Sequence, residues 1–350
     1  MPRARVLSIL AIITSVSSST CLADDNPLFS ADDETLDVVL DVPMRTLLRS
    51  SKKKPVLDGK LSYLDADGNN VTIGLTITTR GKSRLEQCAF PPLSITLNKE
   101  QTPSTLFAGQ RKLKIVTHCR NGAKYRRYLQ QEFGIYKAYN LLSDNSFRVR
   151  MLNVTYRDSE EKRRDDAVQS FFIESDDEVA NRLGMKKLKT QTISQKQFHV
   201  AETNKYELFQ YMIANTDWAI KKGPGTEICC HNGKAIGRPD SEDKWIVLPY
   251  DFDQAGLINT EYALPAIGLP IRNVKQRLYR GRCERNEQLD ASIALFNTKR
   301  NEMEAVLAPP ALSDKERRAV LKYLKVFFDT INDPKKLNRQ VIDKCRGPKR

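Results

Sequence analysis

Two aspartates, Asp251 and Asp253, stand two positions apart directly after the apolar run 245–250, which we predict to be a buried strand. Because side chains alternate along an extended segment, an Asp-x-Asp pair aims both carboxylates to the same side. Strand ends are also where a rigid scaffold presents chemistry. Carboxylate oxygens are preferred ligands of Mg²⁺ and Mn²⁺, so the pair predicts a divalent cation site. Taken alone, the same pair also fits a capped turn.

Two further polar residues extend this pattern. Asp217 follows the predicted end of a helix, and Asn232 begins a predicted hairpin that leads to Asp251. Phosphoryl transfer needs oxygen ligands for a metal and a carboxylate that orients the attacking hydroxyl. We predict that Asn232 joins the two aspartates as a ligand of Mg²⁺ or Mn²⁺. Asp217 is then the candidate that orients the hydroxyl, and a turn residue is its alternative.

Positive side chains for phosphate groups are found earlier in the chain. Lys112 and Lys114 alternate onto one face of a predicted strand, so one of them can point into a cleft. Glu132, on the helix predicted to follow, can approach that lysine, and a buried lysine needs such a partner. The alternative is an edge strand whose lysines are solvated.

The cysteines offer a competing metal site. Cys229 and Cys230 precede His231, and His118 precedes Cys119, so two Cys-His groups could bind Zn²⁺. Adjacent cysteines lack the usual zinc-ligand spacing, however, and an exported chain favours disulfides. The six cysteines that follow Cys21 allow fifteen pairings, which the sequence alone leaves open. We expect one bridge in the first half and two in the second. These six are Cys88, Cys119, Cys229, Cys230, Cys283 and Cys345.

Hydrophobic periodicity divides the chain into a strand-rich part and a helical part. Strands are predicted at 35–42, 56–63, 71–79, 93–97, 113–117, 147–156, 167–175, 228–235 and 244–250. Helices are predicted at 124–142, 176–183, 205–214, 284–307 and 313–330, the last beginning with a capping box at Ser313 and Glu316. We expect an α+β protein with an antiparallel β-rich N-lobe at 24–176, which holds one main helix. A mainly helical C-lobe at 177–350 would carry the metal hairpin, and this is the layout of a two-lobed phosphotransferase.

The N-terminus resembles a secretory signal peptide. Arg3 and Arg5 precede the apolar run 6–16, and small residues follow around 21–23. This run is shorter than the roughly 20 residues of a membrane-spanning helix, and no other segment approaches that length. We expect cleavage after residue 23 and a periplasmic or extracellular protein without a transmembrane segment. A lipid anchor on Cys21 is the alternative.

The chain is basic, with a formal net charge of +14, which becomes +12 when Arg3 and Arg5 are removed. Such a surface suits an anionic partner, for example a nucleotide, a phosphorylated substrate, an envelope polymer or a lipid headgroup. The alternative is that charge serves solubility alone. The block 277–283 is rich in arginine and could hold an acidic substrate or form a solvated face. Nucleic acid is not favoured, because no compact basic and aromatic motif of a known reader is present.

The chain contains an ordered series of blocks: RGKSR at 80–84, KLK at 112–114, QEF at 131–133, FFIE at 171–174, NTDW at 215–218, HN at 231–232 and PYDFD at 249–253. This series resembles the CotH-type family of secreted or spore-coat atypical kinases. Blocks such as CAFPPL, SFRVR and CCHN are similar to those of an uncharacterised exported bacterial branch of that family. The resemblance covers roughly 37–283 and implies a protein-kinase-like fold.

The resemblance also implies residue roles. Lys114 or Lys112 would contact the nucleotide phosphates, with Glu132 as the helix partner and Asp217 as the catalytic carboxylate. Asn232 and Asp251 would bind the metal, and Asp253 would assist them. Arg80 would face the phosphates, and Glu174 would lie near the nucleotide base at the segment joining the lobes. For Glu174, a surface carboxylate at a strand end is the alternative.

These patterns predict an exported phosphotransferase that uses ATP and Mg²⁺ or Mn²⁺. It would move a phosphoryl or nucleotidyl group to a hydroxyl of a protein or envelope component, which is not identified by the sequence. The rival hypothesis is a catalytically silent, kinase-fold envelope protein that binds an anionic ligand.

Overall fold

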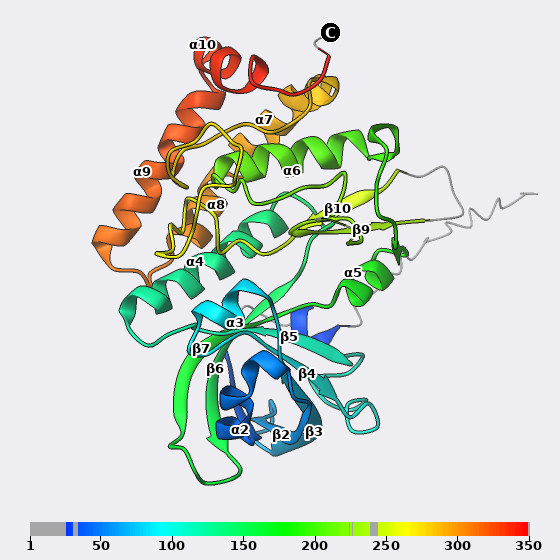
Figure 1. Cartoon of the computed structure of the whole chain (residues 1–350), viewed down its shortest axis with the longest axis vertical. Helices are drawn as coiled ribbons and strands as arrows, with labels where there is room; N and C mark the ends of the chain where they lie inside the picture. The colour runs from blue at the N-terminus through cyan, green and yellow to red at the C-terminus, as the bar shows by residue number, and fades with distance from the viewer. Residues whose placement is uncertain (1–25, 31–33, 224, 226, 239–243, 349–350) are drawn as a thin grey trace, which may run out of the picture.

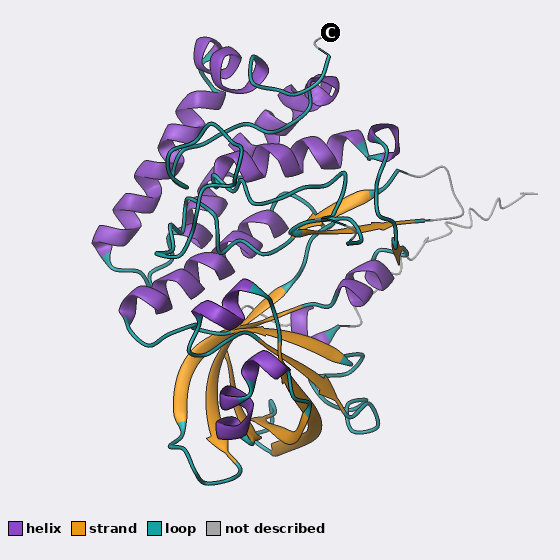
Figure 2. Cartoon of the chain, in the orientation of Figure 1, coloured by secondary structure: helices purple, strands orange, loops and turns teal. Residues whose placement is uncertain are grey.

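The computed structural model describes residues 26–30, 34–223, 225, 227–238 and 244–348. The predicted signal peptide at 1–23, together with the alternative anchor Cys21, lies outside the described residues. Strands gather at one end of the molecule and most helices at the other, as Figures 1 and 2 show. The candidate site lies where these two parts meet.

Seven strands close into a barrel. Around the ring they follow the order β1 (Leu36–Val42), β2 (Leu57–Leu64), β3 (Asn70–Thr79), β4 (Leu93–Leu97), β5 (Lys112–Val116), β7 (Asp166–Ile173) and β6 (Val149–Asp158). Neighbouring strands are antiparallel except for β1 and β6, which run parallel with Leu36 opposite Leu152. Alternate side chains, such as Leu40, Ile73 and Leu113, fill the interior and form one hydrophobic core.

Helix α4 (Ala123–Asn140) connects the barrel to the helical part. Its apolar face shares one core with β7 and with the C-terminal helices, where Tyr136 contacts Phe252 and Phe171. The helix also approaches α8 (Arg300–Leu307) so closely that a side chain at Gly134 would meet the carbonyl oxygen of Val306 at 2.5 Å. Glycine is therefore required at this crossing.

The other long helices complete this core. They are α6 (Val200–Met212), α7 (Leu289–Thr298) and α9 (Asp314–Ile331), and α9 begins with the predicted capping box at Ser313 and Glu316. The predicted helix 284–307 is divided into a 3-10 turn (Cys283–Gln288), α7 and α8. Short helices are α1 (Pro27–Ser30), α2 (Met44–Arg49), α3 (Ser83–Gln87), α5 (Asp176–Arg182) and α10 (Pro334–Leu337).

A second, small sheet lies beside the helices. Its three strands follow the order β10 (Ile246–Pro249), β9 (Gly233–Gly237) and β8 (Lys186–Lys187). The predicted hairpin is confirmed at β9 and β10, where Pro249 lies opposite Gly233. This register brings the start of β9 and the end of β10 together. Asn232 directly precedes β9, and Asp251 follows β10, so these two predicted metal ligands lie at the same end of the sheet.

The expected two-lobed protein-kinase-like fold with an antiparallel N-lobe is wrong. The strands form a closed, mixed barrel, because the parallel pair of β1 and β6 joins its two edges. The main helix does not belong to a separate β-rich lobe either. Its side chains, including Tyr136 and Tyr139, share one hydrophobic core with α6, α8 and α9.

Three disulfides are present, and they confirm the expected division of one bridge in the first half and two in the second. The pairs are Cys88–Cys119, Cys229–Cys230 and Cys283–Cys345. The first holds the C-terminal end of α3, and the third ties the end of the chain to the turn before α7. Since Cys229 and Cys230 are bonded to each other, they are not free thiolates for the alternative zinc site.

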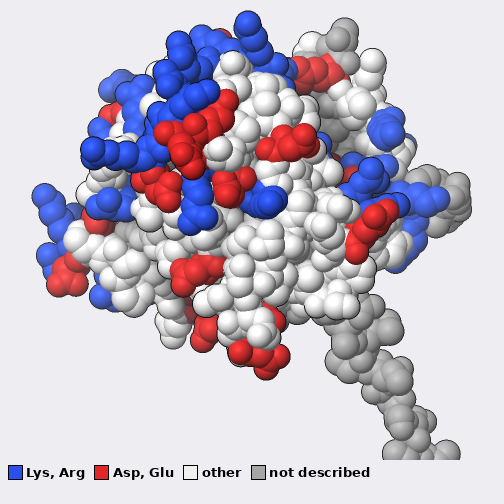
Figure 3. All heavy atoms as spheres, turned by 90° about the horizontal axis from the view of Figure 1, so that it is seen from below, with Lys and Arg blue, Asp and Glu red and all other residues white. Residues whose placement is uncertain are grey.

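None of the helices in the described part of the chain is both long and apolar enough to cross a membrane. The face seen from the barrel end carries basic and acidic side chains intermixed (Figure 3), rather than one uniformly basic patch.

Candidate functional site

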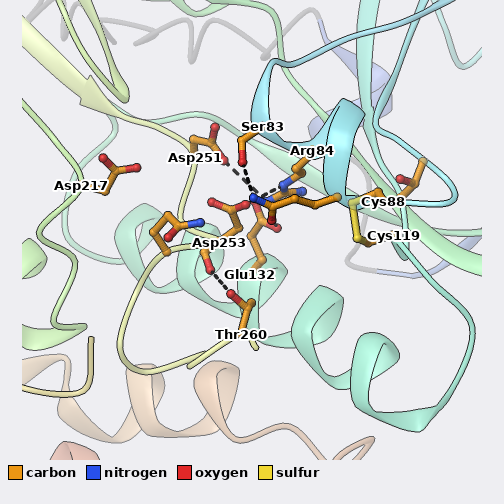
Figure 4. A network of polar contacts seen from close by, with 12 residues as sticks. Ser83, Arg84, Cys88, Cys119, Glu132, Asp217, Asp251, Asp253 and Thr260 are labelled. Atoms are coloured by element: carbon orange, nitrogen blue, oxygen red, sulfur yellow. Dashed lines mark hydrogen bonds and ion pairs between the residues drawn. A yellow bond between two sulfur atoms is a disulfide. The ribbon is translucent and has the colours of Figure 1, made fainter. Parts of the chain in front are cut away.

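Arg84 is the centre of a polar cluster between the barrel and the helices (Figure 4). Its guanidinium donates from Nη2 to Glu132 Oε2 and from Nε to Asp253 Oδ2, each at 2.8 Å. Asp251 Oδ1 lies 3.5 Å from the same Nη2. The Arg84 side chain is only 11% exposed, so one buried cation serves three carboxylates.

The elements around Arg84 explain its position. Residue 84 lies in α3, a short helix after β3, and the disulfide from Cys88 to Cys119 fixes the end of that helix. Glu132 comes from the middle of α4, whereas Asp251 and Asp253 follow β10. Segments far apart in the sequence therefore contribute to one cluster.

The one guanidinium of Arg84 faces three carboxylates, and this affects the pKa values of the carboxyl groups. Although 40% of the Asp251 side chain is exposed, desolvation by the groups around it, and next the carboxylate of Asp253, raise its pKa to about 7, while Arg84 opposes this effect. Burial also raises the pKa of Glu132 above its usual value, against the influence of Arg84. Desolvation is the main cause for both groups, and repulsion from Asp253 adds to it. A further cation would therefore be favourable here.

Asp217 lies beside this cluster with two partners of its own. His231 Nε2 is 2.7 Å from Asp217 Oδ1, and the Asn232 amide nitrogen donates to Oδ2 at 2.8 Å. The hydrogen bond with Asp217 is the main cause that raises the pKa of His231. The backbones of Ala219 and His231 exchange two hydrogen bonds. This bridge brings His231 close to Asp217 although a long segment separates them in the sequence.

Asn232 and Asp251 adjoin the same end of the small sheet. The Tyr250 amide donates to the Asn232 carbonyl oxygen at 3.3 Å, and the Asp251 amide donates to Tyr136 Oη at 3.1 Å. Asp251 has a φ of +61°, a left-handed conformation that turns the chain directly after β10. The structure thus brings Asp217, Asn232 and Asp251 together, as their sequence pattern predicted.

Three positive side chains contact Tyr250: Lys114 and Arg80 from the barrel and Lys234 from the small sheet. Lys114 Nζ lies 4.7 Å and Lys234 Nζ 5.6 Å from the ring centroid, and Arg80 Nη1 donates to Tyr250 Oη at 2.9 Å. Lys114 also lies 3.3 Å from Asp176 Oδ1. This arrangement confines three positive groups around one aromatic ring.

Several predicted residues have other positions or partners. Lys112 is exposed, so Lys114 is the lysine of this strand that the structure brings to the site. Lys114 pairs with Asp176 rather than with Glu132, which Arg84 holds. The predicted pair of Lys114 and Glu132 is therefore wrong. The cation that meets Glu132 comes from α3, which carries Arg84, and not from β5.

Glu174 is fully buried and not at the surface. Arg182 contacts both of its carboxylate oxygens at 3.1 and 3.0 Å, and the Arg148 amide donates to it at 3.1 Å. These contacts give Glu174 a structural role at the end of β7. The arginine-rich block 277–283 is structural as well, since Arg277 and Arg280 donate to the carbonyls of Met212 and Trp218.

Sequence reasoning missed Arg84, Tyr250, Lys234 and Asp176 as members of the site. Arg84 belongs to the same RGKSR block as Arg80, but a short helix had not been predicted there. Tyr250 stands directly before Asp251 and could have been found by the same strand-end argument. Asp176 meets Lys114, and Lys234 meets Tyr250, only through tertiary structure, so no local pattern signals them.

The predicted metal ligands fit a hard divalent cation by the chemistry of their donor atoms. Asp251 has a half-exposed carboxylate in a cluster with excess negative charge, and Asn232 uses its amide nitrogen for Asp217, which leaves the amide oxygen for a metal. Asp253 is partly engaged, because Arg84 binds one of its oxygens. Among the described residues, no group of three or more His, Cys, Asp and Glu is arranged to hold a metal on its own.

Comparison with known proteins gives no relative: no family model matches this sequence, and no curated protein resembles it closely enough to count as a match.

Proposed function

We propose that this protein is a metal-dependent phosphotransferase that moves a phosphoryl or nucleotidyl group from ATP to a hydroxyl of a protein or envelope component. The observation that supports this function is that a group of cations at Tyr250 lies directly beside a group of carboxylates at Asp251. Cations surround the tyrosine ring, whereas the next residue belongs to the carboxylate cluster. A complex of ATP with Mg²⁺ or Mn²⁺ carries both complementary charges.

Each side chain has a role in this proposal. Asp251 and Asn232, assisted by Asp253, would hold Mg²⁺ or Mn²⁺, and the metal would neutralise charge that develops on the phosphate oxygens. Arg80 and Lys114 bind the phosphate groups from the barrel side. Asp217 orients the attacking hydroxyl, while its bonds to His231 and Asn232 fix the carboxylate.

The cellular setting belongs to the same proposal. Three disulfides suit an oxidising compartment, which supports export of the chain to the periplasm or beyond the cell. The sequence blocks similar to the CotH-type family support the chemistry only, because the fold implied by that resemblance is wrong. The basic side chains near Tyr250 favour an anionic group on the acceptor or donor.

A second candidate function is an envelope protein that binds an anionic ligand without turnover. The engagement of both Asp217 oxygens favours it, since His231 and Asn232 occupy the carboxylate that an attacking hydroxyl would need. Such a protein would use Arg80, Lys114 and Lys234 but would have no need for a metal.

Thermal unfolding with ATP and Mn²⁺ tests the nucleotide site. Ligand at about 100 times its dissociation constant should add roughly 2.7 kcal/mol to the unfolding free energy of the oxidised wild type. We expect this gain to require both ATP and Mn²⁺ and to vanish in Asp251→Ala. The control is Asp290→Ala, which removes an exposed carboxylate on α7 and should keep the gain.

Turnover separates the two candidates. Asp217→Asn should bind ATP and Mn²⁺ as the wild type does but should lose at least 10²-fold in phosphoryl transfer to a hydroxyl acceptor. Binding that is independent of Mn²⁺, with no transfer by the wild type, would support the silent protein. If the folded wild type gains no stability from ATP, whichever divalent metal ion is added, ATP is not the ligand.

A further inference from the structure

Asp176 is a carboxylate placed among the phosphate-binding cations. It lies 3.3 Å from Lys114 Nζ and 3.5 Å from Lys187 Nζ, and among the described residues it is the acid that forms an ion pair with Lys114. Burial alone would raise the pKa of Asp176, but Lys114 and Lys187 outweigh it and hold the pKa at about 2. An anion is therefore already present where a phosphate would bind.

The fold, and not the lysines, determines where this carboxylate lies. Asp176 is the first residue of α5, directly after Ser175, whose Oγ accepts a hydrogen bond from the Glu178 amide at 3.2 Å. This capping box fixes the start of the helix. Lys114, in contrast, has a long, flexible side chain. It can leave the Asp176 carboxylate and bind another anion near Tyr250.

The other two cations form no ion pair with the described residues, although Asp176 attracts Lys234 from farther away, and Glu132 and Asp251 attract Arg80. Arg80 donates to the Tyr250 hydroxyl and to the Leu93 carbonyl oxygen, and Lys234 faces the Tyr250 ring. An anion that reaches Lys114 alone would only replace Asp176 and would gain little. A chain of two or more phosphates can reach Arg80 and Lys234 as well, and these contacts can compensate for separating Lys114 from Asp176.

We propose that Asp176 is a positioning residue that holds Lys114 until a polyphosphate displaces it, so that the site excludes single phosphate groups. This inference rests on the phosphate half of the proposed function and extends it. The ligand class is a di- or triphosphate chain. Asp176 competes with that chain for Lys114 at ion-pair distance, whereas no carboxylate of the described residues lies that close to Arg80 or Lys234.

Asp176→Asn tests the competition, with inorganic phosphate and pyrophosphate as probes and no metal present. Titration calorimetry at low ionic strength should give about fivefold to tenfold tighter binding of pyrophosphate than in the wild type, as expected for loss of one part-buried competing charge. We expect no detectable binding of inorganic phosphate by the wild type and measurable binding by Asp176→Asn.

Asp177→Asn is the matched control. It changes the charge by the same amount in the same helical turn, but Asp177 is 67% exposed and pairs with Lys187 instead of Lys114. We expect less than a twofold change. Adding Lys114→Gln to Asp176→Asn should abolish the gain and so assign it to Lys114. Thermal unfolding of each variant shows that it is folded before titration.

The results separate this inference from the function on which it rests. Equal pyrophosphate affinity in wild type, Asp176→Asn and Asp177→Asn would overturn the competition but leave the phosphate site intact. Weaker binding by Asp176→Asn would also overturn it, since Asp176 would then assist the ligand. If none of the folded variants binds pyrophosphate, both the inference and the phosphate half of the proposed function are wrong.

Discussion

At the scale of single residues, Arg84 decides how the candidate site is assembled. It joins a carboxylate on α4 to two carboxylates after β10, and it is buried while doing so. The sequence pattern located Asp217, Asn232 and Asp251 correctly as neighbours, since strand ends and helix ends mark such positions. It could not locate Arg84, because a guanidinium is matched to its acids by tertiary structure.

Arg84→Gln should destabilise the protein by about 3–5 kcal/mol at neutral pH, since it leaves buried carboxylates without their cation. The loss should be smaller at pH 5, because the carboxyls of Glu132 and Asp251, whose pKa values are already raised, become protonated. Chemical denaturation at both pH values measures this difference.

Lys82→Gln is the control for that experiment. Lys82 lies two positions before Arg84, is exposed, and pairs with Glu227 on the surface. Its removal should change the unfolding free energy by less than about 1 kcal/mol. A similar loss in both variants would show that Arg84 acts through local helix structure rather than through the carboxylates.

At the scale of elements, the sequence predicted most strands and the long helices, because their apolar periodicity is a local property. It missed α3, whose five residues are too short for a periodic signal, and it joined α7 to α8 across the bend at Lys299. Barrel closure was also missed. The parallel direction of β1 and β6 depends on the path of the whole chain between them, and no feature of either strand encodes it.

The capping box of α5 gives a prediction about pH. Burial, with Glu174 adding to it, raises the pKa of Glu178 from 4.5 to about 7. Since the folded pKa lies above the unfolded one, the full stability is present below about pH 4.5 and is lost as the pH rises through 7. Glu178→Gln should remove this loss, with a gain of up to about 3 kcal/mol at pH 8.

Thermal unfolding between pH 4 and pH 9 measures the effect. Glu316→Gln is the matched control, because Glu316 has the same capping-box position in α9 but a lowered pKa, caused mainly by its bond to Ser313. For Glu316 the sign is opposite: it contributes stability above the unfolded pKa, so its replacement should slightly destabilise the protein at pH 8. Equal pH profiles for wild type and Glu178→Gln would contradict the prediction.

At the scale of the whole molecule, two of the disulfides connect segments that are far apart in the sequence. The Cys283–Cys345 bridge closes a loop of 62 residues that includes α7, α8 and α9. Sequence reasoning predicted how the bridges divide between the halves but left this pairing open, since spacing does not determine which ends meet in space.

Replacing Cys283 and Cys345 by serine should lower the unfolding free energy by about 4 kcal/mol, the loop-closure entropy of a chain this long. Thermal unfolding without reductant measures the loss. The wild type with reductant should show at least the same decrease, because all three bridges are then open. A double serine variant as stable as the oxidised wild type would show that packing alone fixes the end of the chain.

The parallel contact of β1 with β6 also affects how the chain can fold as it emerges. Val39, Leu40 and Asp41 of β1 can pair with β2 early, but the other edge of β1 stays open until β6 has been made. Open strand edges attract strands of other chains. A chain that stops before β6 would therefore aggregate instead of forming a smaller barrel, and a chaperone that covers the edge of β1 during synthesis or export would raise the yield of folded protein.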